Sequence, residues 1–167
     1  GYGYSWEPHH PTAYWPVGTF AIYGMLFWIF GHDYVPVVIF QIIIGVAIVA
    51  VSMMVASRWF GDHTAIITGW LLACWPLLIQ YTTILASELF FILFVLLAFW
   101  LAGIRASSTG RWLLKGGAAG IALAGASYVR PLALIMAPLL FIGPLNSRKK
   151  RGLALAACVS AIISMII

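Results

Sequence analysis

The 167-residue chain is 63% hydrophobic and only 8% charged, whereas about 25% of the residues of soluble domains are charged. This composition excludes a soluble globular protein, because a core of this size cannot bury so much apolar surface. The basic residues behind the net charge of +5 are expected to contact anionic lipid head groups. The sequence has no aromatic-basic pattern of the kind that binds nucleic acid, so no nucleic-acid partner is expected. We predict an all-α, polytopic transmembrane helix bundle, with residues 1–167 forming a single transmembrane domain.

Residues 1–33 are predicted to form an extracytoplasmic loop and an interfacial helix. The apolar runs that follow predict membrane spans, since about 20 apolar residues cross a bilayer. The first run closes on Arg58 and Gly61, which are typical of a helix C-terminus. In the second, Trp75-Pro76 is expected to kink or end the helix, because proline lacks a backbone N–H. The predicted spans are about 34–57, 64–81, 88–104, 112–129, 131–145 and an incomplete one at 153–167.

The cations predict the orientation, because Lys and Arg accumulate in cytoplasmic loops. If residues 112–145 form a helical hairpin interrupted at Arg130-Pro131, eight of the nine Lys and Arg residues lie inside and only Arg130 lies outside. This indicates a multi-pass membrane protein whose extracytoplasmic face carries Arg130. The chain has no starting Met and its last apolar run is short, so we expect further sequence on both sides.

Glu88 and Arg130 are the main candidates for substrate binding on the outer face, and their opposite charges predict that they approach each other. A carboxylate at the mouth of an apolar helix needs a partner, but Glu88 also suits the first turn after Ser87 as N-cap. Arg130 could grip a phosphate bidentately, or anchor the hairpin tip at the membrane interface. At such a tip it is expected to pack against little.

Residues near the N-terminus are further candidates. Glu7 is a candidate catalytic residue, and His9 and His10 are candidate substrate-binding residues, since carboxylate and imidazole carry protons and bind metals. A rigid polar loop is the alternative. A divalent metal cofactor is left open, and no residue is assigned to it. Tyr14 could stack on a sugar, although tyrosines also collect at membrane interfaces.

Short motifs, in a fixed order, resemble the polyprenyl-phosphate-dependent glycosyltransferases of the C-type fold, which include protein O-mannosyltransferases and lipid A aminoarabinose transferases. Residues 12–18 look like the family's Ala-Tyr-Tyr-Pro-Pro-Gly segment, with Val17 in place of the second proline. The remaining similar positions are Phe30-Gly31, Gln41 with Gly45, Arg58-Trp59-Phe60-Gly61, Trp75-Pro76 with Tyr81 and Ser87-Glu88, the Gly120–Gly125 helix, and Val129-Arg130-Pro131.

The resemblance implies a membrane glycosyltransferase, hexosyl or pentosyl, that moves a sugar from a polyprenyl-phosphate donor to a lipid, glycan or protein acceptor on the extracytoplasmic face. It also implies that the main catalytic acidic residue lies upstream of Gly1, after a first helix that this chain does not contain. Two alternatives stay open from the residues alone, a multi-span transporter and a structural membrane subunit. A transporter would place ionisable residues in mid-span, whereas here they lie at span ends.

Overall fold

The computed structural model describes residues 5–7, 10–11, 17–103 and 109–136. Helices make up nearly all of this part, which confirms the all-α class. Two very short strands, β1 (Ser5–Glu7) and β2 (His10–Pro11), pair antiparallel within the predicted loop. This strand pair was not predicted, since five residues are too few for an alternating pattern to be recognised.

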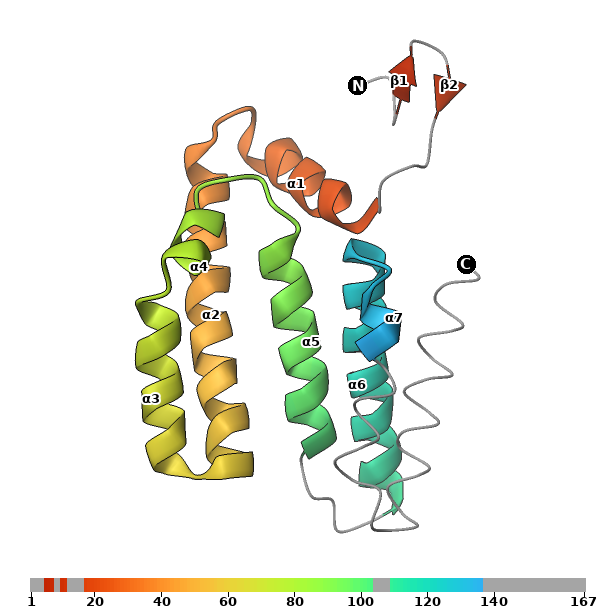
Figure 1. Cartoon of the computed structure of the whole chain (residues 1–167). Helices are drawn as coiled ribbons and strands as arrows, with labels where there is room; N and C mark the ends of the chain where they lie inside the picture. Colours follow the sequence, from red (N-terminus) through yellow and green to blue (C-terminus); the bar gives the residue numbers. More distant parts are fainter. Residues whose placement is uncertain (1–4, 8–9, 12–16, 104–108, 137–167) are drawn as a thin grey trace.

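The helices form a row that is covered at one end. Helices α3, α2, α5 and α6 stand side by side in that order, and α1 lies across the end where α5 begins and α6 finishes (Figure 1). The bounds are α1 Val17–Phe30, α2 Val35–Phe60, α3 Asp62–Ala73, α4 Pro76–Tyr81, α5 Glu88–Gly103, α6 Thr109–Val129 and α7 Ala133–Met136.

The ends of α2 and α3 follow from local chemistry. Gly61 closes α2 with φ of +95°, a backbone conformation that residues with a Cβ rarely adopt, and its N–H bonds to the Ser57 carbonyl at 3.0 Å. Trp75 is extended and Pro76 begins α4, because a proline is tolerated only in the first turn of a helix. The predicted span 64–81 is therefore two helices rather than one, and the expectation that Trp75-Pro76 ends the helix is confirmed.

The core lies in two places. One cluster fills the α5–α6 interface, where Ala98 and Leu123 are buried. The other lies beneath α1, where Tyr23 and Val37 meet Phe90 and Val129. The second cluster includes Val129, which directly precedes Arg130, so packing beneath α1 fixes the position of Arg130.

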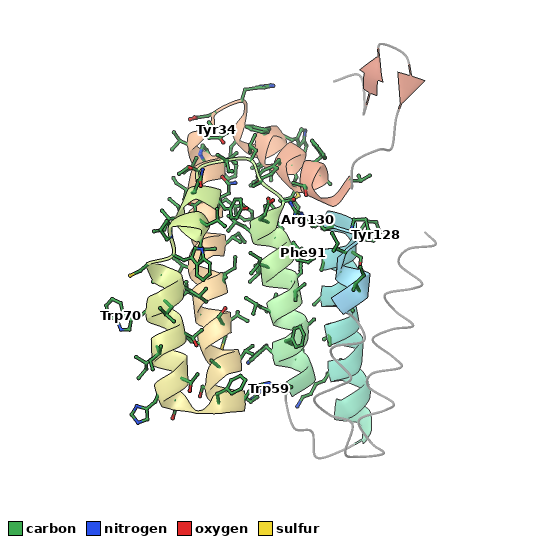
Figure 2. The ribbon with its side chains drawn as sticks, in the orientation of Figure 1. Tyr34, Trp59, Trp70, Phe91, Tyr128 and Arg130 are labelled. Carbon is green, nitrogen blue, oxygen red and sulfur yellow. The ribbon has the colours of Figure 1, made fainter. Side chains whose placement is uncertain are left out.

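The outer surface remains strongly apolar. Trp28 is 85% exposed and Trp70 is 70% exposed, and Figure 2 shows Trp70 pointing away from the bundle.

Within the described ranges one helix, α2, is long and apolar enough to cross a membrane, with a mean hydropathy of 2.7. Helices α1 and α5 are apolar but shorter. The polytopic arrangement remains a prediction. Predicted span 131–145 is described only as far as residue 136, and 153–167 lies outside the described residues.

The two ends of the row carry different residues. Tyr34 and Arg130 lie at the end covered by α1, whereas Trp59 lies at the opposite end (Figure 2). The loop from Thr82 to Ser87 also lies at the α1 end, because α4 finishes there and α5 begins there (Figure 1). The helix connections thus bring together segments that are separated by more than 40 residues in the sequence.

Candidate functional site

The candidate site lies where α6 finishes, α5 begins and α1 crosses the row. Arg130 follows the last residue of α6, and Pro131 prevents the helix from continuing. The Arg130 N–H still bonds to the Ala126 carbonyl at 2.8 Å, and its carbonyl accepts a bond from the Ala133 N–H at 3.0 Å. The backbone at Arg130 is therefore held on both sides, and its side chain projects from a fixed point.

Glu88 and Arg130 form an ion pair between Oε1 of the carboxylate and Nη2 of the guanidinium. The predicted approach of these two residues is confirmed. Arg130 Nε also donates to the Ser87 hydroxyl at 2.9 Å. The side chains of Arg130 and Glu88 are 38% and 24% exposed, so the pair is partly shielded from solvent and is stronger than an ordinary surface pair.

The environment of Arg130 corrects one expectation. Arg130 was expected to pack against little at an exposed hairpin tip, but it bridges the end of α6 to the start of α5 through two side-chain partners. Truncating it would leave Glu88 without its charge partner, which is more costly than an ordinary surface change.

The guanidinium retains donors for a ligand. A guanidinium has five N–H groups arranged in a planar fork. Ser87 and Glu88 occupy the edge formed by Nε and Nη2, and within the described part of the chain Nη1 has no hydrogen-bond partner. The group is thus oriented by one edge and can bind an anion with the other.

A cavity of about 310 Å³ adjoins this group. This volume is at the lower limit for small-molecule sites. Thr19 contributes from α1, and its hydroxyl oxygen is buried with no hydrogen-bond partner in the described structure. Few of the groups that line the cavity are polar, and most of its lining is apolar. Such a lining suits a ligand with a polar head and an apolar tail. The lining residues are Thr19, Phe20, Leu85, Ser87, Val129, Arg130, Pro131 and Leu132.

The N-terminal candidates are only partly placed. Glu7 in β1 and His10 in β2 are partners in the strand register, so their backbones lie side by side. His9 and Tyr14 lie outside the described residues. The catalytic role of Glu7 and the substrate-binding roles of His9, His10 and Tyr14 stay predictions. Among the residues that the structure describes, no three His, Cys, Asp or Glu side chains converge on a common point where a metal could bind.

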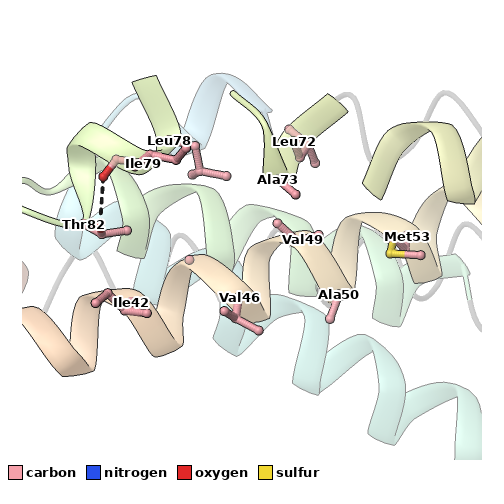
Figure 3. Close-up of a pocket in the computed structure, with 11 residues that line it drawn as sticks. Ile42, Val46, Val49, Ala50, Met53, Leu72, Ala73, Leu78, Ile79 and Thr82 are labelled. Atoms are coloured by element: carbon pink, nitrogen blue, oxygen red, sulfur yellow. Dashed lines mark hydrogen bonds between the residues drawn. The ribbon is translucent and has the colours of Figure 1, made fainter. Parts of the chain in front are cut away.

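A larger groove of about 610 Å³ lies between α2 and the α3–α4 break (Figure 3). Its lining is almost wholly apolar, from Ile42 near one end to Met53 at the other. The one hydroxyl there, on Thr82, donates to the Ile79 carbonyl of α4 at 2.8 Å. The groove therefore presents no group that could carry out acid–base chemistry.

Sequence reasoning missed a buried polar network that reaches the candidate site. Gln41 of α2 is fully buried, and its amide donates to the Tyr23 hydroxyl at 2.8 Å and to the Ile84 carbonyl at 2.5 Å. The Tyr23 hydroxyl donates to the Ala86 carbonyl at 3.0 Å. Gln41 is polar within an apolar run, and such a residue needs a partner. The partner was not predictable, because nothing in the sequence links Gln41 to residue 84.

Comparison with known proteins identifies the family to which the chain belongs. The family model described as dolichyl-phosphate-mannose-protein mannosyltransferase matches residues 9–167, which is nearly the whole chain. No curated protein and no solved structure gives a significant match. The family consists of membrane mannosyltransferases that use a polyprenyl-phosphate-linked sugar donor, which agrees with the resemblance carried by the motifs. The extent of the match and the ordered motifs together place this chain in the dolichyl-phosphate-mannose-protein mannosyltransferase family.

Proposed function

We propose that this chain forms the donor-binding part of a multi-pass glycosyltransferase of the plasma membrane, the bacterial inner membrane. The enzyme transfers a hexosyl or pentosyl group from polyprenyl phosphate to a lipid, glycan or protein acceptor on the extracytoplasmic face. The observation that carries the proposal is the group formed by Ser87, Glu88 and Arg130 beside a cavity, in a chain that belongs to this family.

Arg130 is proposed to bind the donor phosphate. In a polyprenyl-phosphate sugar the phosphate is a diester with one negative charge. When the bond between the sugar carbon and the phosphate oxygen breaks, the leaving polyprenyl phosphate gains a second negative charge. A guanidinium beside that oxygen stabilises the transition state more than the bound donor, and this difference accelerates the reaction.

Glu88 has two opposing effects on this role. Its carboxylate partly cancels the charge of Arg130 and so weakens the attraction for phosphate. It also fixes the guanidinium, together with Ser87, so that the open edge does not have to be ordered when the donor binds. We propose that the second effect dominates, because only one edge of the fork is occupied.

The acceptor hydroxyl must lose a proton, and a carboxylate is the usual base. Glu7 is the proposed base within this chain. The motif resemblance instead implies a main catalytic acidic residue upstream of Gly1. The two assignments are separable, because Glu7→Gln in the full-length protein should abolish transfer only if Glu7 is the base.

The arrangement of the two ends supports the proposed orientation. The end that carries Arg130 also carries the Thr82–Ser87 loop and α1, whereas Arg58 lies in the last turn of α2 at the other end. We propose that the Arg130 end faces outward, with α1 at the interface, since this leaves most cations in the cytoplasm.

The decisive experiment compares Arg130→Ala, Arg130→Lys and the matched control Arg58→Ala in the purified full-length protein. Arg58 is an exposed arginine at the opposite end, so its removal changes the net charge equally without touching the site. Transfer from polyprenyl-phosphate mannose to acceptors in native membranes should fall roughly 10²-fold in Arg130→Ala and recover partly in Arg130→Lys. Activity in Arg130→Ala equal to that of Arg58→Ala would overturn the proposal.

A further inference from the structure

The loop from Thr82 to Ser87 is held by side chains from outside it. Three of its carbonyl groups accept long-range hydrogen bonds. The Thr83 carbonyl accepts from the Tyr34 hydroxyl at 3.3 Å, the Ile84 carbonyl from the Gln41 amide at 2.5 Å, and the Ala86 carbonyl from the Tyr23 hydroxyl at 3.0 Å. Such a loop is not free to adopt the many conformations that a surface connection usually samples.

Two of these three bonds are linked to each other, the one from Tyr23 buried and the one from Gln41 partly buried. Gln41 is 0% exposed and Tyr23 is 6% exposed, and the Gln41 amide donates to the Tyr23 hydroxyl as well as to the loop. Burial raises the pKa of the Tyr23 hydroxyl to about 12, so the neutral form that donates to the Ala86 carbonyl persists to strongly alkaline pH. The ring of Tyr23 packs edge-to-face on Phe90, with ring centroids 5.4 Å apart, which fixes where the hydroxyl lies.

The network contains one atom without a hydrogen-bond partner. Gln41 Oε1 is buried with no hydrogen-bond partner in the part of the chain described. A buried acceptor without a partner is unfavourable. The Ile84 carbonyl requires a donor, so the NH₂ group faces the loop and the amide oxygen is left without a partner. The amide orientation therefore serves the loop at the expense of its own oxygen.

The held segment leads directly into the candidate site. Ala86, whose carbonyl is fixed by Tyr23, directly precedes Ser87, and Ser87 precedes Glu88. These two residues hold Arg130 through Nε and Nη2. A shift of the loop would move the Ser87 hydroxyl and the Glu88 carboxylate together. The guanidinium of Arg130 would then either move with them or lose its hydrogen bonds to them.

We propose that Gln41 and Tyr23 are positioning residues, which fix the Thr82–Ser87 loop so that Ser87 and Glu88 present the open edge of Arg130 to the adjacent cavity. Neither residue needs to touch the donor. They act through the backbone of the loop, and a supporting shell of this kind determines how well a binding group is preorganised. The consequence for donor binding rests on the proposed function, whereas the effect on the loop does not.

The test uses Gln41→Met and Tyr23→Phe, which remove the polar groups and keep most of the packing volume. The matched control is Ser52→Ala, which alters another buried polar residue of α2, three turns from Gln41. With polyprenyl-phosphate mannose as the donor, KM should rise roughly three- to tenfold in both variants, with little change in Ser52→Ala. A role limited to overall stability would lower the amount of active enzyme and leave KM unchanged.

A second readout does not depend on activity. Leu85 lies within the held loop and is 49% exposed, so Leu85→Cys reports on the loop when Cys74 and Cys158 are replaced by alanine. Reaction with a water-soluble maleimide should be several-fold faster when Gln41→Met or Tyr23→Phe is added, and unchanged with Ser52→Ala. Unchanged labelling in both variants would overturn the positioning role. Faster labelling with both KM and kcat unchanged would keep the hold on the loop and overturn the assignment of the donor phosphate to Arg130.

Discussion

Gly18, near the start of α1, lies against the backbone of Tyr128, near the end of α6. A Cβ placed on Gly18 would be 2.7 Å from the Tyr128 carbonyl oxygen and 3.1 Å from the Val129 nitrogen. Real Cβ atoms do not approach backbone atoms so closely, and a backbone carbonyl in a packed helix cannot move aside as a flexible side chain can. The close approach of α1 to the residues just before Arg130 therefore requires glycine at this position.

Gly18→Ala should accordingly destabilise the protein by about 1–3 kcal/mol, because the added methyl group must separate α1 from α6. Gly24→Ala is the matched control, since it lies in the same helix and a Cβ there would meet nothing within 4 Å. It should be neutral or slightly stabilising, because alanine is the better helix former. Thermal unfolding of both variants in detergent measures the difference. Equal unfolding temperatures would mean that α1 does not pack on α6 at this point.

Removing Arg130 from the ion pair should reduce stability more than removing the charge of Glu88. Arg130→Ala leaves the partly buried Glu88 carboxylate without a partner and should cost about 1–3 kcal/mol. Glu88→Gln keeps an oxygen that can accept from Nη2 and should cost less. The double variant should be more stable than Arg130→Ala alone, because the uncompensated charge is gone. Thermal unfolding of the three variants tests this, and strictly additive losses would show that the two side chains do not interact.

The proposed orientation predicts which positions react from outside the cell. In a background without Cys74 and Cys158, Leu132→Cys beside Arg130 should react with a membrane-impermeant maleimide in intact cells. His63→Cys, which is exposed in the first turn of α3 at the other end of the row, should react only after the membrane is opened. The reverse pattern would invert the topology and remove the site from the outer face.

Alkaline pH should destabilise the protein partly through Tyr23. Burial raises its pKa to about 12 from an ordinary value of 10.0, so the folded state retains the proton after the unfolded chain has lost it. The stability contributed by the neutral phenol is complete below pH 10 and is lost as the pH rises toward 12. Unfolding temperatures measured across this range should fall more steeply in the wild type than in Tyr23→Phe. Parallel curves would show that Tyr23 is not buried.

The features that could be predicted from the sequence are those determined by the backbone chemistry or the charge of individual residues. Pro76 and Gly61 end helices because of their own backbone chemistry, and both ends were anticipated. The approach of Glu88 to Arg130 was also anticipated, since charge distribution and span order place both at one end. These predictions needed no knowledge of which helix faces touch.

Features that depend on helix faces were not predictable. In a chain whose helices are apolar all round, the periodicity that normally marks a buried face is lost. Gln41 could be identified as exceptional, but its contacts with Tyr23 and the loop depend on the rotation of α2 and on α1 crossing the row. Ser87 was assigned as a helix cap, and its role as a partner of Arg130 followed only from the way α6 packs on α5.

The unequal lengths of adjacent helices have a consequence for the surrounding lipid. Helix α2 has 26 residues and its neighbour α3 has 12, which correspond to about 39 Å and 18 Å at 1.5 Å per residue. The hydrocarbon layer is about 30 Å thick. In the proposed topology α2 must tilt or extend beyond this layer, whereas α3 is prolonged along α2 by the six residues of α4 (Figure 1). The tilt of α2, and with it the activity of the enzyme, should therefore depend on bilayer thickness.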